Sequence, residues 1–228
     1  MKNLLYKEWK LSMTPQSWIF LIMVGMVFIP DYPIIIPGVF ALSAIPQMIA
    51  FSKEANDILF TATLPIKRND VPKSKILFVI SYELLFLLLI IICLIPAGYL
   101  YSHFSTATDV EGNFLYGNNA GMDANIAVVG IYLLTFAVNN FIFFPWYYKH
   151  PDKFTVPFFV SFIIASLFGC AIYFALGFMP FTKDIFDALT IDNWYYQLIF
   201  TVCSGLIFVG LSFLTIRLSV KHFAKVDI

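Results

Sequence analysis

The sequence predicts an all-α, polytopic integral membrane protein with six transmembrane helices, an N-terminal interfacial helix and both termini in the cytoplasm. Of its 228 residues, 60% are hydrophobic and only 12% are charged, whereas a soluble domain has about 25% charged residues. Apolar stretches of roughly twenty residues recur, which is the length that crosses about 30 Å of hydrocarbon. Basic residues gather in alternate connections between these stretches. Lipid is therefore the expected surrounding solvent.

Six apolar segments are the candidate spans. They cover residues 16–30, 34–51, 76–101, 124–148, 154–180 and 194–217. The third, fourth and fifth are long enough to cross with tilt. The first two are short and are joined through Pro30 and Pro33, so they form either two short spans or one re-entrant hairpin. Both alternatives return the chain to the same side and leave the later topology unchanged.

The basic residues set the orientation, because Lys and Arg near span ends are retained in the cytoplasm. Thirteen of the 14 basic residues fall in the N-terminal segment, the connections 52–75 and 149–153, and the C-terminal tail. Only Lys183 lies on the opposite side, in the short acidic segment 181–193. The remaining outer connections are the turn at Asp31 and a polar loop over residues 102–123. Residues 1–228 therefore form a single transmembrane domain.

The first 14 residues form an expected interfacial helix. One side carries Leu5, Trp9, Ser12 and Met13. The other side carries Lys7, Glu8 and Lys10, which we expect to reach lipid headgroups. Such a helix lies in the plane of the membrane surface. The alternative is a frayed cytoplasmic extension of the first span.

Motifs for catalysis and metal binding are missing from the sequence. There is no Gly-x-x-x-x-Gly-Lys-Ser/Thr phosphate loop, no His-Glu-x-x-His and no Gly-x-Ser-x-Gly. The three histidines share no helix face, and the three cysteines lie in apolar stretches, where they are expected to pack rather than to form disulfides. A zero net charge gives no sign of nucleic acid binding. We expect a non-catalytic chain with no metal site and no cofactor of its own.

The inner connection 52–75 is the most informative stretch of the chain. Ser52 is expected to cap a short helix, with acidic residues in the first turns, where the helix dipole favours them. Leu64-Pro65 ends it, and a second helix start follows at Asn69-Asp70. A short amphipathic helix held by two spans fits a groove on a cytoplasmic partner; the alternative is an ordinary surface loop. The expected contact residues are Lys53, Glu54, Asn56, Asp57, Ile58, Leu59, Ala62 and Leu64.

The order of elements and the segment from Asn56 to Lys75 resemble the membrane subunit of bacterial ATP-binding-cassette (ABC) exporters of the type-2 permease class. In that family the loop after the second span has a Ser-Leu-Pro followed by basic residues. This chain has Thr63-Leu64-Pro65 followed by Lys67-Arg68. A second similarity is Phe144-Pro145-Trp146-Tyr147-Tyr148-Lys149 at the end of the fourth span. The chain departs from the family after that point, where His150-Pro151 replaces a frequent Gly.

The resemblance implies a mechanism and partners. Two such permease subunits, identical or homologous, would pair in the bilayer and sit on two separate ATPase subunits, which bind ATP and Mg²⁺. The segment from Lys53 to Leu64 would be the coupling helix that fits the ATPase. By its small size the chain is similar to exporters of phenol-soluble modulins, so an amphipathic or hydrophobic substrate, such as a peptide, would cross the bacterial cytoplasmic membrane. The alternatives are an ATP-independent membrane binding or immunity protein for such peptides and a membrane-embedded enzyme.

Three polar residues are expected at membrane depth. Glu83 lies about eight residues into the third span, roughly 12 Å along the helix, and an ionised carboxylate there needs a partner or a water-filled path. Asn139 and Asn140 lie near the middle of the fourth span. These residues either line a substrate path or a subunit interface, or they form hydrogen bonds between helices.

Overall fold

All regular elements in the described part of the chain are helices. The computed structural model describes residues 2–29, 32–55, 61, 66–104, 122, 124–151, 153–186 and 193–225. The elements are α1 (Lys2–Ser12), α2 (Pro15–Ile22), η1 (Met23–Phe28), α3 (Ile36–Glu54), α5 (Asp70–Phe104), α6 (Ala127–Lys149), α7 (Thr155–Phe178), α8 (Lys183–Phe186) and α9 (Trp194–Phe223). The expected all-α class is confirmed.

Five of the described helices are long and apolar enough to cross a membrane: α3, α5, α6, α7 and α9. A sixth span is counted if α1 and the α2–η1 segment are taken together, although the chain bends by 86° between them. The structure thus has the helices of a multi-pass membrane protein. It supports five or six spans.

The α2–η1 segment begins at a well-defined cap. Thr14 Oγ1 accepts a hydrogen bond from the backbone N–H of Ser17 at 3.2 Å, and Pro15 occupies the first helical position, where its missing N–H costs nothing. The segment then tightens into the 3₁₀ helix η1. Because a 3₁₀ helix rises about 2.0 Å per residue and an α-helix about 1.5 Å, Pro15–Phe28 measures roughly 24 Å. That is slightly less than the hydrocarbon thickness.

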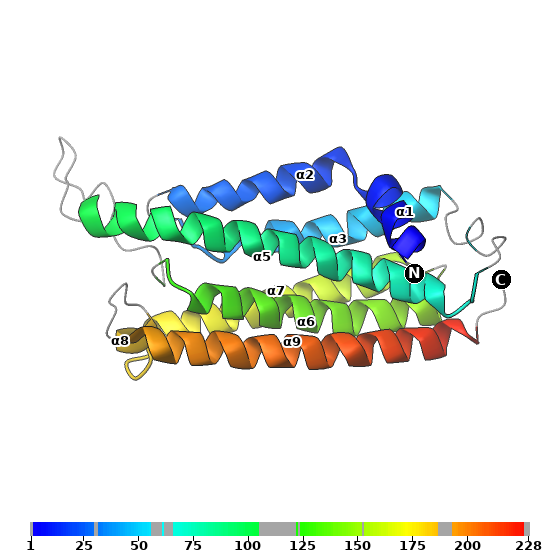
Figure 1. The fold of residues 1–228 in the computed structure, drawn as a ribbon. Helices are drawn as coiled ribbons and strands as arrows, with labels where there is room; N and C mark the ends of the chain where they lie inside the picture. Colours follow the sequence, from blue (N-terminus) through cyan, green and yellow to red (C-terminus); the bar gives the residue numbers. More distant parts are fainter. Residues whose placement is uncertain are drawn as a thin grey trace.

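The long helices run antiparallel in sequence order, so the bundle has two distinct ends (Figure 1). One end holds α1, residues 66–69, the turn between α6 and α7, and the last turn of α9; we call it the α1 end. The other end holds α8 and is called the α8 end. The beginning of α1 and the C-terminal end of α9 both lie at the α1 end. The basic connections of the sequence therefore meet at one end of the molecule.

Helix α6 is the centre of the bundle. In its most apolar stretch 78% of the residues are buried, compared with 22% in α7 and in α9. It packs mainly on α7 and α9, whereas α1, α2, η1, α3 and α5 pack on one another. We call these two sets the α6 group and the α5 group. The low burial of α7 and α9 leaves apolar side chains on the outside, as a lipid-facing helix requires.

Small residues bring the helices of the α6 group close together. A Cβ atom added at Gly130 of α6 would lie 2.8 Å from the ring of Phe200 in α9. One added at Gly169 of α7 would lie 2.6 Å from Thr135 Oγ1 in α6. Glycine at these positions allows the close approach on which helix association in membranes depends.

Two sequence-based boundaries differ from the structure. Ser52 does not begin a new helix: it lies in the last turn of α3, where its Oγ donates to the carbonyl of Met48 at 3.1 Å. The side chain bonds backward into its own helix rather than forward as a cap. Helix α5 runs to Phe104, so the expected outer loop begins later than residue 102. Residues 105–121 of that loop lie outside the described part.

Candidate functional site

A buried ionic cluster joins three helices at the α1 end. Its members are Glu8 and Ser12 of α1, Ser52 of α3 and Lys75 of α5, and their exposed fractions lie between 1% and 6%. We call it the Glu8–Lys75 cluster. Its helices are far apart in the sequence, so this cluster fixes α1 across the ends of α3 and α5.

Lys75 is the hub of the cluster. Its ammonium group forms an ion pair with Glu8 Oε2 and donates to Ser52 Oγ at 2.7 Å and to Ser12 Oγ at 3.1 Å. Ser12 Oγ also donates to Glu8 Oε2 at 2.9 Å. An ammonium group has three N–H donors, and three acceptors surround it here. Such bonding is what a buried charge pair needs to offset its loss of hydration.

The cluster corrects the expected role of Glu8. The sequence places Glu8 on the headgroup side of the first helix, but the residue is only 2% exposed and turns toward Lys75. The helical period alone brings Glu8 close to Ser12, one turn later. The cationic partner comes from α5, which the local pattern of the first helix does not contain.

Between the end of α3 and the start of α5, Thr61 links the inner connection to this cluster. Thr61 is 1% exposed, and its Oγ1 accepts a hydrogen bond from Lys7 Nζ at 2.7 Å. Lys7 Nζ also lies 3.2 Å from Glu8 Oε1. A continuous polar path therefore runs from the inner connection at Thr61 through α1 to Lys75 at the start of α5.

Trp9 adds a hydrogen bond and an aromatic contact between α1 and α5. Trp9 Nε1 donates to Ser81 Oγ of α5 at 3.0 Å, and the Trp9 ring meets the ring of Phe78 edge to face, with centroids 5.5 Å apart. The sequence predicts that Trp9 lies with Leu5 and Met13 on one side of the interfacial helix. In the structure Trp9 also attaches that helix to α5.

Two further contacts at the α1 end connect the α3–α5 connection with the α6 group. Lys53 Nζ at the end of α3 donates to the carbonyl of Pro151 at 3.0 Å, in the turn between α6 and α7. The guanidinium of Arg68 lies 5.6 Å from the ring centroid of Phe223 at the end of α9, within the range of a cation–π interaction. Residues at both ends of the α3–α5 connection thus contact the α6 group.

The expected coupling residues lie only partly in the described chain. Lys53 and Glu54 form the end of α3. The other six lie outside the described residues: Asn56, Asp57, Ile58, Leu59, Ala62 and Leu64. The structure therefore leaves the coupling helix itself as a prediction.

At membrane depth the structure brings together two of the three predicted polar residues. Asn140 Nδ2 of α6 donates to both carboxylate oxygens of Glu83 of α5, at 2.8 and 2.9 Å. Glu83 is fully buried, and Asn139 is buried next in sequence to Asn140. Among the described side chains Glu83 has no cationic partner, and the Oδ1 atom of Asn140 has no hydrogen-bond partner. The contact joins the α5 group to the α6 group inside the bundle.

The sequence does not identify four residues of the buried polar network: Lys7, Glu8, Thr61 and Lys75. The signal in the sequence is weak: Lys75 is one of five basic residues in the connection 52–75, and their pattern does not distinguish a buried lysine from a solvated one. Among the described residues no group of three His, Cys, Asp or Glu side chains is placed to hold a metal ion.

Comparison with known proteins gives no relative: no family model matches the chain, and no curated protein or solved structure matches it.

Proposed function

We propose that this chain is the permease subunit of an ATP-driven exporter in the bacterial cytoplasmic membrane. In this proposal the α2–η1 segment is the first of six spans, and the α1 end faces the cytoplasm. Two permease subunits pair, and each contacts a separate ATPase subunit through the segment from Lys53 to Leu64. The substrate is an amphipathic or hydrophobic molecule such as a peptide.

The observation that carries the proposal is the path from Thr61 to the Glu8–Lys75 cluster. A coupling segment must transmit force to the spans, and a loop bound only to solvent cannot do so. Here Thr61 is bonded to Lys7, and α1 is bonded in turn to α3 and α5. Movement of this connection by a partner would therefore displace α1 and the start of α5 together.

The flanks of the same connection support a coupled movement of both helix groups. Lys53 bonds to the α6–α7 turn and Arg68 stacks on Phe223 of α9. Between the groups, the Glu83–Asn140 contact is a polar junction that such a movement would strain. A transporter needs groups of helices that move against each other, and these contacts lie where the two groups meet.

The first experiment is co-purification from the native cell in mild detergent. The tagged wild-type chain is expected to retain an ATPase in stoichiometric amount, and a chain with residues 53–64 scrambled is expected to lose it. A chain with residues 105–121 scrambled is the matched control, because that segment joins α5 and α6 at the α8 end.

The outcomes separate the proposed function from its alternative. Loss of the ATPase from the first variant alone supports both the permease and the coupling segment. A wild-type chain that purifies without any ATPase, yet still binds and protects cells from an amphipathic peptide, would instead be an ATP-independent binding or immunity protein. Equal loss from both scrambled chains would contradict the assignment of the coupling segment.

A further inference from the structure

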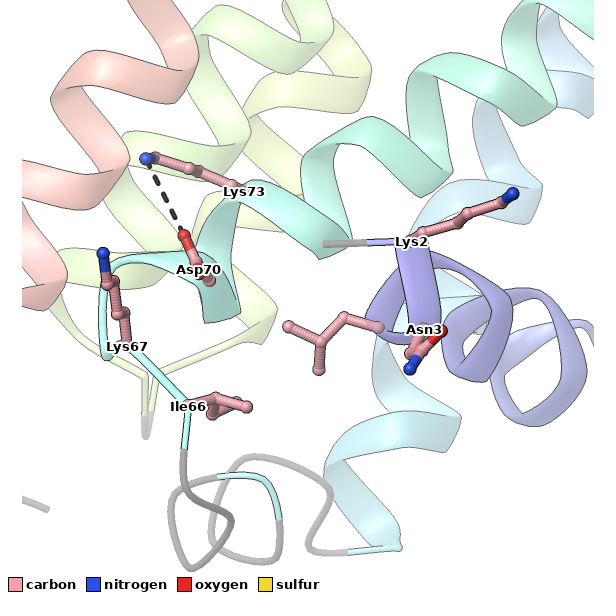
Figure 2. A pocket seen from close by; sticks show the side chains of 7 residues that line it. Lys2, Asn3, Ile66, Lys67, Asp70 and Lys73 are labelled. Atoms are coloured by element: carbon pink, nitrogen blue, oxygen red, sulfur yellow. Dashed lines mark ion pairs between the residues drawn. The ribbon is translucent and has the colours of Figure 1, made fainter.

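A cavity of about 660 Å³ lies beside the beginning of α1. Its volume falls within the range of roughly 300–1,000 Å³ that is typical of ligand pockets. Figure 2 shows α1 on one side and the segment that leads into α5 on the other. The lining residues are Lys2, Asn3, Leu4, Ile66, Lys67, Asp70 and Lys73.

The rim of this cavity is positively charged. The described residues of the rim include three lysines and one carboxylate, and the carboxylate of Asp70 forms a long ion pair with Lys73, at 3.9 Å. Lys2 and Lys67 are exposed, and their side chains have no ion pair or hydrogen bond with other described residues. Two ammonium groups are thus available to an anion.

The cavity also has an apolar part. Ile66 points toward α1 in Figure 2, and Leu4 of α1 is largely buried. The lysines come from three different segments and are spread around the rim rather than directed at one point (Figure 2). A single small ion would need converging donors. A larger, amphipathic anion fits this distribution better.

The position of the cavity indicates where that anion comes from. Helix α1 turns by 86° from the α2–η1 segment, and its side chains Tyr6 and Leu11 are more than half exposed. A helix that crosses the end of a membrane bundle with exposed apolar side chains lies in the bilayer interface. The cavity at its beginning is therefore at the level of lipid headgroups.

We propose that this cavity binds the phosphate-bearing headgroup of an anionic phospholipid from the leaflet in which α1 lies. Lys2 and Lys67 contact separate oxygen atoms of the phosphate and the rest of the headgroup, and Leu4 and Ile66 contact the glycerol and upper acyl region. Basic pockets at the ends of spans recognise anionic headgroups in this way. The lipid would bridge α1 and the entry to α5, next to the Glu8–Lys75 cluster. This binding needs no ATPase and is independent of the proposed export.

The test uses the full chain in nanodiscs of phosphatidylcholine alone or of phosphatidylcholine mixed with phosphatidylglycerol. The lipids that remain bound after transfer to detergent are measured by native mass spectrometry. We expect wild type to retain phosphatidylglycerol in excess of its share. Because each basic residue near a surface contributes a factor of about five to anionic lipid affinity, K2Q and K67Q should each reduce the excess about fivefold. The pair K221Q and K225Q is the control, since both lysines are exposed at the same end but outside the cavity.

Three outcomes would overturn the proposal. Wild type could retain the two lipids without preference, or the control pair could lose as much preference as the cavity variants. Free glycerol 3-phosphate could displace the lipid at equal concentration, in which case the site binds free phosphate compounds. If K2Q and K67Q keep the lipid preference but lose a co-purifying ATPase, the cavity contacts an acidic protein surface instead.

Discussion

Glu8 and Lys75 are separated by 67 positions in the sequence, yet their charges form a buried pair. A buried ion pair adds little net stability compared with apolar residues of the same shape, but removal of one partner leaves an uncompensated charge. The two serines occupy remaining bonding positions around the ammonium group. At the residue scale, therefore, this cluster fixes the position of α1 against α3 and α5 and adds little net stability to the bundle.

Replacement of Lys75 by Met should destabilise the protein strongly. The variant leaves the Glu8 carboxylate buried without its cation, a change that costs about 3–5 kcal/mol. The measurement is the midpoint of thermal unfolding in detergent. K73M is the control two positions away, where the lysine is 41% exposed, and it should change stability by less than about 0.5 kcal/mol. The double variant E8L/K75M should recover most of the loss, and failure to recover would contradict the ion-pair explanation.

The Glu83–Asn140 contact is a second junction at the residue scale. Replacement of Asn140 by Leu removes the donor to both carboxylate oxygens, so we expect a loss of about 1–3 kcal/mol in stability. E83Q keeps a group that can bond to Asn140 and should be close to wild type in stability. Transport assays on E83Q address mechanism: unchanged transport together with unchanged assembly would restrict Glu83 to a structural role between the helices.

At the scale of the elements, close contacts between helices depend on small residues at particular positions. Gly38 lies in the first turn of α3, and a Cβ atom added there would overlap the ring of Tyr132 in α6. That ring cannot move aside easily, because its hydroxyl donates to the carbonyl of Ile34 and its face is packed by Phe86 and Phe136. Gly38 therefore limits how closely α3 and α6 can approach each other.

The variant G38A should therefore lower stability by about 1–3 kcal/mol, the usual effect of forcing extra atoms into a packed core. G210A in α9 is the matched control, because no atom of another helix lies within 4 Å of a Cβ added there. The control should be neutral or should gain up to about 1 kcal/mol, since alanine favours helix over glycine. Thermal unfolding in detergent measures both. Equal effects at the two positions would contradict the close contact with Tyr132.

On the scale of the whole molecule, the alternating direction of the helices places the beginning of α1 and the end of α9 at one end of the bundle (Figure 1). Thirteen of the 14 basic residues belong to the segments that meet there, and Lys183 belongs to α8 at the other end. From the positive-inside rule we expect the basic end to face the cytoplasm. The two ends are thus expected to face different compartments.

Cysteine labelling checks this orientation. In a chain with Cys93, Cys170 and Cys203 replaced by alanine, we expect K183C to react with a membrane-impermeant maleimide in intact cells. We expect K225C to react only after the membrane is permeabilised. Both sites are exposed in the structure, so accessibility to water does not limit either reaction. Labelling of both from the same side would show that the number of spans between them is even, and it would contradict the proposed topology.

Much of the fold could be predicted because it depends on local composition. The helices α6, α7 and α9 begin within three residues of the positions read from the apolar stretches, since the length of an apolar stretch is set by the thickness of the bilayer. The start of α5 near Asp70 was also predicted from its local start signal. The prediction for Ser52 was wrong, because an N-cap and a serine that bonds back into the preceding turn have the same local sequence.

The site was less predictable than the fold. Glu83 and Asn140 were identified from the sequence because a polar residue in an apolar stretch is conspicuous. That they bond to each other depends on which faces of α5 and α6 meet. Glu8 was assigned to the surface because charged residues next to other charged residues usually are solvated. Its partner Lys75 was hidden among the basic residues that mark span ends.

The sequence by itself determined the class of the protein, the helical segments and the separation of charge between the two ends, because each of these follows from the transfer of a single side chain or stretch between water and lipid. Only the tertiary structure decided which helix lies at the centre, that α1 is attached through a buried ion pair, and that a cavity lined by lysines opens beside it. These features depend on contacts between residues distant in the sequence, whose energies are set by packing and mutual burial rather than by the hydropathy of any one segment.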